Sequence, residues 1–222
     1  MKKLILIGPP GAGKGTAARV IAEKYNIPHI STGDIFREVA SRDDELGRFI
    51  KAELEQGHLI DDQITNGIVK ERLIQPDCIN GYILDGYPRS LIQAIEFDAS
   101  NSESDTNEIV ILFNLNEEEA VKRILGRLTC PKCKASYNEN AEELRPKQPG
   151  ICDNCQTNLI RRGDDEEKAI RVRFEKYMEV TRPLIEYYNK KGSLFTVASN
   201  ISALNTLEQI DKIIDNYYEN NR

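Results

Sequence analysis

Residues 4–16 read Leu-Ile-Leu-Ile-Gly-Pro-Pro-Gly-Ala-Gly-Lys-Gly-Thr, the most informative segment of the chain. The apolar run predicts a buried strand, the glycines a tight turn, and the residues from Lys14 onward a helix. Glycines let several backbone N–H groups point at one anion, and the positive end of the helix adds to that field. The stretch therefore predicts a phosphate-binding loop, with Lys14 reaching the outer phosphates and a hydroxyl beside magnesium. The usual pattern has Ser or Thr directly after the lysine, whereas here Gly15 precedes Thr16.

The alternative reading of this stretch is an ordinary glycine-rich turn between a strand and a helix. Six matching positions after a four-residue apolar run favour phosphate binding instead. The loop alone does not separate the many classes of protein that bind ATP or GTP.

The charge balance bounds the partners of the chain. Its 222 residues carry a net charge of −6, which argues against nucleic-acid binding and requires any anion site to be a local cluster of arginines. The basic start followed by residues 4–7 superficially resembles a signal peptide, but the apolar part is too short and the glycine loop interrupts it. We therefore expect a cytoplasmic protein with reduced cysteines and without a membrane span.

Strand and helix patterns alternate along the chain, which predicts an α/β fold with a parallel sheet covered by helices on both faces. Two segments, 31–60 and 127–164, interrupt the alternation and are predicted to be insertions over the site. Residues 98–107 are rich in Ser, Asn and Asp and predict a solvated loop. Strands are expected at 4–7, 27–30, 82–84, 109–115 and 194–197, and helices at 14–25, around 35–39, at 45–75 with a break at Gly57, and at 117–125, 165–189 and 204–218.

Four cysteines form two C-x2-C pairs, Cys130 with Cys133 and Cys152 with Cys155. This spacing is typical of a structural zinc site, because each pair brings two thiolates to one side of a tetrahedron. Two disulfides or four unrelated core cysteines are the alternatives, and the expected reducing compartment disfavours disulfides. With four protein ligands the metal has no open position, so we expect it to be structural.

A strand end carries Asp85-Gly86-Tyr87-Pro88-Arg89. Asp85 can hold magnesium through water, and Arg89 can form a bidentate contact with a phosphate. The two histidines, His29 and His58, do not form a base–nucleophile set. The other candidate arginines are Arg37, Arg123, Arg127, Arg162 and Arg173.

Together these motifs closely resemble the adenylate kinases of the long, zinc-lid type found in bacteria. The resemblance covers nearly all 222 residues and includes Ser31-Thr32-Gly33-Asp34, Gln93 and Arg161-Arg162-Gly163-Asp164-Asp165. It implies a P-loop nucleoside monophosphate kinase fold with a five-stranded parallel sheet in one domain, 1–222. Within that domain it implies a helical AMP-binding flap at 31–60 and a small zinc-ribbon lid at 127–164.

The resemblance also implies a role for each matching position. The residues that it implies for binding ATP are Gly11, Ala12, Gly13, Lys14, Gly15, Thr16, Arg127, Ser136, Tyr137 and Ile201. The residues that it implies for binding AMP are Thr32, Arg37, His58, Leu59, Ile60, Gly86, Tyr87, Pro88, Arg89, Gln93, Arg162 and Arg173. Around the transferring phosphoryl group it implies Lys14, Asp85, Arg89, Arg123, Arg162 and Arg173.

The implied reaction is ATP + AMP ⇌ 2 ADP with magnesium, carried out by a cytoplasmic monomer that maintains the adenine nucleotides. Thr32 favours AMP as the acceptor, since related pyrimidine kinases usually have Ala there. The alternatives are another nucleoside monophosphate kinase, a GTP-preferring AMP kinase, or a nucleotide-gated binding protein with a zinc ribbon. Departures from the family pattern occur at Ala17, Lys134, Ser199-Asn200 and Asp61, the last of which replaces a proline and is expected to loosen its turn.

Overall fold

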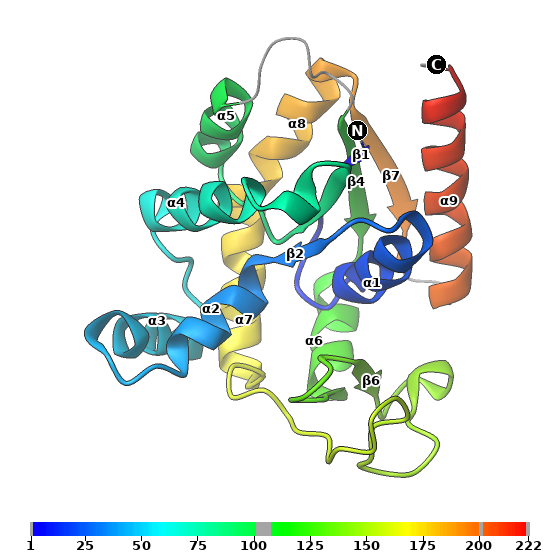
Figure 1. The fold of residues 1–222 in the computed structure, drawn as a ribbon. Helices are drawn as coiled ribbons and strands as arrows, with labels where there is room; N and C mark the ends of the chain where they lie inside the picture. The colour runs from blue at the N-terminus through cyan, green and yellow to red at the C-terminus, as the bar shows by residue number, and fades with distance from the viewer. Residues whose placement is uncertain (1, 101–107, 200–201, 221–222) are drawn as a thin grey trace.

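The computed structural model describes residues 2–100, 108–199 and 202–220, and it contains the five-stranded parallel sheet that the sequence predicts. Strand β1 lies at the centre, between β3 and β4, so the chain fills one side of it before crossing to the other (Figure 1). A crevice forms at such a crossing point, at the carboxyl end of the central strand. The strands lie in the order β2 (His29–Ser31), β3 (Gly81–Asp85), β1 (Lys2–Ile7), β4 (Glu108–Asn114), β7 (Leu194–Ala198).

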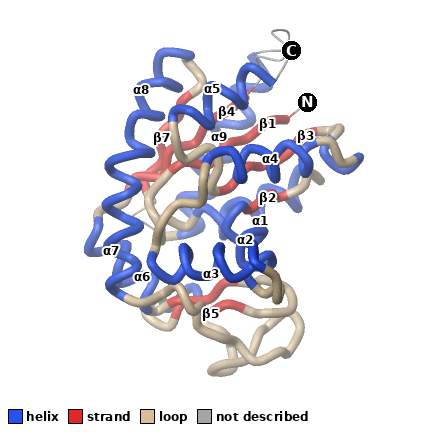
Figure 2. The backbone as a smooth tube through the Cα atoms, turned by 90° about the vertical axis from the view of Figure 1, so that its left-hand side faces the viewer, coloured by secondary structure: helices blue, strands red, loops and turns tan. Residues whose placement is uncertain are grey.

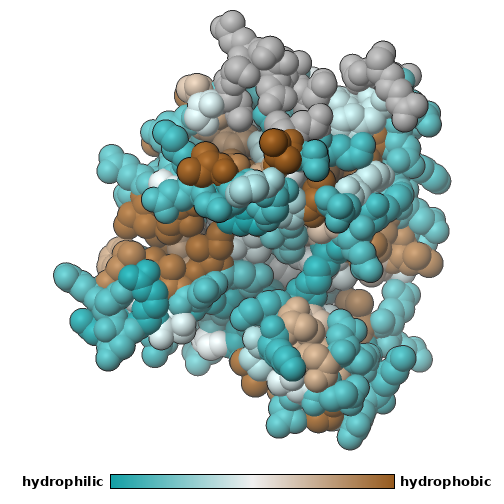
Figure 3. Space-filling model, viewed as in Figure 1, coloured by the Kyte–Doolittle hydropathy of each residue, from teal (hydrophilic) through white to brown (hydrophobic). Residues whose placement is uncertain are grey.

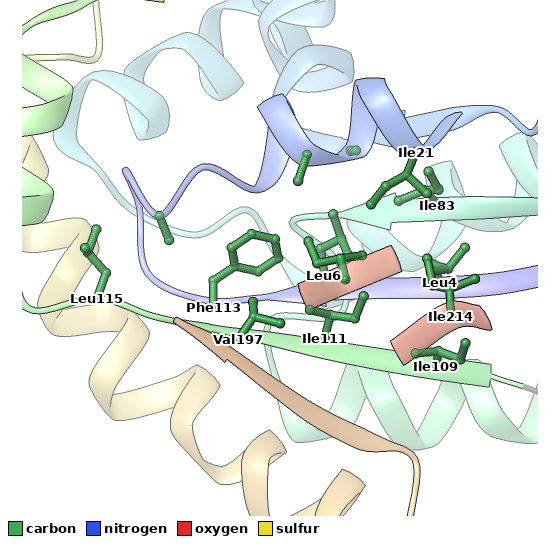
Figure 4. Packing of buried hydrophobic residues seen from close by; sticks show 14 of the residues in the cluster. Leu4, Leu6, Ile21, Ile83, Ile109, Ile111, Phe113, Leu115, Val197 and Ile214 are labelled. Atoms are coloured by element: carbon green, nitrogen blue, oxygen red, sulfur yellow. The ribbon is translucent and has the colours of Figure 1, made fainter. Parts of the chain in front are cut away.

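Helices cover both faces of the sheet, as the alternating pattern predicts. On one face α1 (Lys14–Tyr25) and α9 (Ala203–Asn220) pack on the sheet through side chains such as Ile21 and Ile214. These meet Leu4, Leu6 and Ile111 of β1 and β4, which are almost fully buried (Figure 4). On the other face lie α4 (Asp62–Leu73), α5 (Leu91–Ser100) and α8 (Arg182–Lys191). Burial on both faces explains why the strands read as continuous apolar runs.

The first insertion is helical and has a small hydrophobic cluster of its own. It contains α2 (Thr32–Ala40) and α3 (Glu45–Gln56), and the chain returns to the sheet through α4. Phe36, Ile50 and Ile60 form the cluster. Helix α3 ends at Gly57, which has φ 77°, a left-handed conformation that glycine adopts without strain.

The second insertion follows α6 (Glu117–Leu125) and contains little regular structure. Strands β5 (Arg127–Thr129) and β6 (Ser136–Asn138) form a hairpin, and a short 3₁₀ helix, η2, covers Glu142–Leu144. The second insertion projects away from the sheet, below α6 in Figure 1. In Figure 2, α3 of the first insertion lies between the second insertion and the sheet. Its outer surface is largely hydrophilic (Figure 3). The domain boundaries 31–60 and 127–164 remain predictions.

The predicted single helix over 165–189 is interrupted. The structure has α7 (Glu167–Lys176), a π-helical segment η3 (Tyr177–Thr181) and then α8. Pro183 lies at the start of α8, and because proline has no N–H and clashes with the preceding turn it breaks regular α-helical bonding there. The prediction of a solvated loop at 98–107 is also wrong for its first three residues, because 98–100 form the last turn of α5. Residues 101–107 lie outside the described residues.

Asp61, which stands in place of the proline, is the residue before α4, and that it loosens the turn remains a prediction. Its carboxylate accepts hydrogen bonds from the N–H groups of Gln63 at 2.8 Å and Ile64 at 3.4 Å. This is an N-cap, which satisfies donors that the first helical turn leaves free.

A short 3₁₀ helix, η1, covers Pro76–Cys78. No helix in the described ranges is both long enough and apolar enough to span a bilayer.

Candidate active site

A cavity of about 680 Å³ opens at the carboxyl ends of β1 and β3, between the two insertions. The residues that line it come from the glycine loop, both insertions, the end of β3 and α7. Most of the predicted site residues are among them: Gly11, Ala12, Gly13, Lys14, Gly15, Thr16, Arg37, His58, Leu59, Ile60, Asp85, Gly86, Pro88, Arg89, Gln93, Arg123, Arg127, Ser136, Tyr137, Arg162 and Arg173.

Two predicted residues in the described part of the chain, Thr32 and Tyr87, do not line this cavity. Thr32 is 1 % exposed, and its hydroxyl donates to the carbonyl of Gly86 at 2.8 Å. Tyr87 is buried, and its hydroxyl donates to Asn66 at 2.8 Å. Ile201 lies outside the described residues. The roles of all the site residues remain predictions.

The glycine loop forms one end of the cavity. Gly13 precedes α1 in a left-handed conformation, and it has no side chain that could cap the helix. The first N–H groups of α1 are therefore available to an anion. A side chain at Gly11 would place its Cβ 2.9 Å from the carbonyl of Ala120, so only glycine lets the loop pack against α6.

Lys14 closes the loop on itself. Its Nζ donates to the carbonyls of Gly8 and Pro9, both at 2.8 Å. Burial, helped by the charges of Arg89, Arg173 and Arg127, lowers the pKa of Lys14 to about 8, although Asp85 opposes this. The ammonium is thus held in an environment that an anionic phosphate would make more favourable.

Asp85 lies at the end of β3 with its carboxylate 3.2 Å from His29 Nε2. Burial alone would raise the pKa of Asp85, but the hydrogen bond with His29 and the charges of Lys14 and Arg89 lower it overall. The carboxylate is therefore ionised at neutral pH and lies next to the loop: a Cβ on Gly15 would be 3.2 Å from its Oδ2. Ionised oxygen ligands beside a phosphate loop fit magnesium held through water.

Arginines gather in the middle of the cavity. Burial, followed by the charges of other arginines, lowers the pKa of Arg89 to about 10 and of Arg162 to about 9, and burial also lowers that of Arg173. Asp164 partly offsets this charge, with Arg173 Nη1 at 3.0 Å from its Oδ2. Cations crowded to this degree create a strong field for a polyanion.

Arg123 and Arg127 differ in their surroundings. Arg127 forms an ion pair with Asp165, and its charge contributes to the lowered pKa of both Lys14 and Arg162. Arg123 instead pairs with Glu119 on its own helix, Nε to Oε1 at 3.0 Å. Within the described residues, Arg127 therefore belongs to the central cluster of charge more clearly than Arg123.

Arg89 is held through its backbone by residues to which sequence reasoning assigned no such role. Its N–H donates to Gln93 Oε1 at 2.7 Å, and its carbonyl accepts from the hydroxyl of Thr181 at 2.9 Å. Thr181 is the last residue of the π-helical segment and is buried. The chain separation of 92 residues explains why no local pattern indicated this contact.

The four cysteines of the second insertion converge on one point. Their sulfur atoms all lie within 4.8 Å of one another, with Cys130 and Cys155 at 3.4 Å and Cys133 and Cys152 at 3.5 Å. A disulfide has its sulfurs about 2.05 Å apart, whereas thiolates at about 2.3 Å from one zinc ion are separated by about 3.8 Å. The arrangement therefore fits a tetrahedral metal site.

Two tight turns support this cluster. Lys134 and Gln156 follow the two cysteine pairs with φ 61° and 58°, and their N–H groups donate to the carbonyls of Cys130 and Cys152. Neither residue is a glycine, so both hold a left-handed backbone conformation that costs a residue with a side chain some strain. The carbonyl of Lys134 also accepts a hydrogen bond from Arg19 of α1, which joins the second insertion to the glycine-loop helix.

A phosphate loop on the central strand, an arginine cluster and two insertions over one cavity define the class of P-loop nucleoside monophosphate kinases. Comparison with known proteins narrows this class. The model of the family described as adenylate kinase matches residues 6–193.

Adenylate kinases from several thermophiles are similar over nearly their whole length. The chain is 46% identical to that of Thermotoga neapolitana over 217 residues, 96% of this chain and 97% of the relative. It is 45% identical to that of Archaeoglobus fulgidus over 213 residues, again 96% and 97%. The chain belongs to the adenylate kinase family and is an enzyme.

Proposed function

We propose that this enzyme transfers the γ-phosphoryl group of MgATP reversibly to AMP, giving two ADP. The observation that carries the proposal is one cavity that the glycine loop, Gln93 and arginines from several elements line together. Two nucleotides bound from opposite ends would bring their phosphates together among those arginines. Membership of the adenylate kinase family supports the same reaction.

Positioning and cancellation of charge would perform most of the catalysis. The acceptor phosphate is already an anion, so no general base is needed, and the two histidines have no role as one. Lys14, Arg89, Arg162 and Arg173 would neutralise the charge on the moving group, which in phosphoryl transfer is the main task of the protein. Burial is the main cause of their lowered pKa values and the charges of nearby arginines add to it, so an anionic phosphate would stabilise their charged forms.

Asp85 and Thr16 would hold the waters around a magnesium ion bound with ATP. Magnesium would supply further positive charge between the phosphates. Both residues line the cavity beside the glycine loop.

The two insertions would exclude water from the reaction. They approach each other in this structure, with Arg37 Nη1 3.8 Å from Asp164 Oδ2. An open site would let water take the phosphoryl group, so closure protects ATP from hydrolysis. Residues 31–60 are accordingly the AMP-binding flap and residues 127–164 the lid.

The four lid cysteines would hold a structural zinc ion. The lid has few buried apolar residues beyond Ala135 and the cysteines themselves, so a metal would contribute much of its folding energy. We further propose a cytoplasmic monomer that acts on ATP, AMP and ADP in nucleotide metabolism.

A panel of donors and acceptors tests the proposal. Purified enzyme with magnesium is given ATP or GTP as donor and AMP, CMP, UMP or GMP as acceptor, and the products are separated by chromatography. The expected result is ADP from ATP and AMP, with much slower reaction of the other acceptors. Preference for CMP or UMP would replace the proposal with another nucleoside monophosphate kinase, and GTP preference would change the donor.

A further inference from the structure

Gln93 is a buried amide with both ends held. It lies on α5, is 2 % exposed and lines the cavity beside Gly86 and Arg89. Its Oε1 accepts from the backbone N–H of Arg89 at 2.7 Å. Its Nε2 donates to Asp62 Oδ1, also at 2.7 Å.

These two partners determine which way the amide faces. A backbone N–H can only donate and a carboxylate can only accept, so turning the amide over would oppose two donors at one end and two acceptors at the other. Each end of the amide still has capacity. The oxygen has a second lone pair and the nitrogen a second hydrogen, so Gln93 can offer one acceptor and one donor to a ligand.

A second set of contacts fixes Asp62 itself. Its Oδ2 accepts a hydrogen bond from the hydroxyl of Ser90 at 2.9 Å. The oxygen of this Ser90 hydroxyl in turn accepts a hydrogen bond from the backbone N–H of Gln93 at 3.1 Å. Asp62 begins α4, where the flap returns to the sheet, and α4 lies beside α5 (Figure 1). The carboxylate therefore links the flap's return helix to the amide on α5.

The order of donor and acceptor distinguishes purine bases. Along its Watson–Crick edge adenine offers an amino donor and the N1 acceptor. Hypoxanthine and guanine offer the O6 acceptor and the N1–H donor, the reverse order. An amide free to turn over could pair with either edge, whereas an amide with a fixed orientation can pair with only one.

We infer that Asp62 is a specificity-determining residue of the acceptor site, because it fixes the Gln93 amide in the orientation that accepts 6-amino purines and rejects 6-oxo purines. The inference rests on the proposed function, since it takes the Gln93 end of the cavity as the site of the acceptor base. Asp62 acts as a positioning residue: it contacts Gln93 and not the nucleotide.

The experiment compares AMP with IMP, which differ at position 6 of the purine and in the proton on N1. Wild type, Asp62→Asn and Asp62→Ala are assayed for kcat/KM with each acceptor at saturating MgATP. An asparagine can present either its oxygen or its nitrogen to Gln93 and an alanine presents neither, so in both variants only the Arg89 N–H still favours the present orientation of the amide. We expect the IMP-to-AMP ratio of kcat/KM to rise about tenfold in both, the size of effect of one hydrogen bond to a charged group.

Asp61→Asn is the matched control. It removes the same charge one residue earlier, keeps a side chain that can cap α4, and contacts neither Gln93 nor the cavity. Its ratio should equal that of wild type. A general loss of stability would lower the rates with both acceptors together, so the ratio separates positioning of Gln93 from a merely structural role.

An unchanged ratio in both Asp62 variants, with melting temperatures that show them folded, would overturn the inference. It would leave the proposed function intact, because wild type would still form ADP from AMP. If wild type forms no ADP from AMP, the proposed function fails, and calorimetric binding of AMP and IMP to the same variants tests Asp62 independently.

Discussion

Replacing Arg89 with methionine should make the free protein more stable while it removes most of the activity. Burial and neighbouring cations lower the pKa of Arg89 to about 10 from an ordinary value of 12.5. One pKa unit corresponds to about 1.4 kcal/mol, so charged Arg89 costs the folded state about 3 kcal/mol. For a base with a lowered pKa this cost is complete below pH 10, and it is therefore present in full at pH 7.

The substitution also removes a hydrogen bond. Arg89 Nε donates to the Gly86 carbonyl at 2.8 Å, which contributes about 1 kcal/mol. That carbonyl keeps its hydrogen bond from the hydroxyl of Thr32, so no buried acceptor is left without a partner. The net gain is about 2 kcal/mol, or about 4–8 °C in melting temperature for a chain of this size.

The assay measures thermal unfolding without nucleotide and ADP formation from ATP and AMP. We expect Arg89→Met to melt higher than wild type and to lose at least about 10³-fold in kcat/KM, as when an arginine that stabilises a transferring phosphoryl group is removed. Such opposite changes are typical of residues kept for function at the expense of stability.

Arg171→Met is the control for this substitution. Arg171 lies on α7 outside the cavity lining, its side chain is 41% exposed, and it pairs with Glu167 at 2.8 Å, which raises its pKa. Its replacement should leave the melting temperature equal or lower and the activity unchanged. A lower melting temperature for Arg89→Met would show that charged Arg89 does not destabilise the fold, and ADP formation near the wild-type rate would show that it does not act on the phosphoryl group.

Three further predictions concern the cap, the loop lysine and the lid. Asp61→Ala should lower the free energy of unfolding by about 1 kcal/mol in urea titrations, because it removes the capping hydrogen bonds. Asp61→Asn should retain most of that stability, and equal losses in the two variants would contradict a stabilising N-cap at this position. Because burial lowers the pKa of Lys14 to about 8, kcat/KM for ATP should fall as the pH rises above that value, and a flat profile to pH 9.5 would count against this assignment. Removing zinc with a chelator should lower the melting temperature and expose 127–164 to protease more than it slows ADP formation at room temperature. An unchanged melting temperature would contradict a structural role for the metal.

Local patterns were sufficient for most of the secondary structure. The apolar runs predicted all five strands, and the limits of α1 and α6 agree with the structure. The errors have local causes that the patterns did not weigh. Pro183 interrupts a long helical pattern, and the polar segment at 98–107 begins with the last turn of α5. Aspartate is a strong N-cap residue, so the cap that Asp61 forms on α4 could also have been predicted from residue type.

The phosphate loop, the four-cysteine site and the arginines could be predicted from the sequence, because each depends on residue type or on short, fixed spacing. How these parts act on one another follows from the tertiary structure alone. Contacts such as Thr181 with Arg89, or Asp62 with Gln93, join residues that are 92 and 31 positions apart. The lowered pKa values of the cavity's cations likewise arise from burial and from charges on different elements. Such interactions depend on distance in space, which no pattern of neighbouring residues contains.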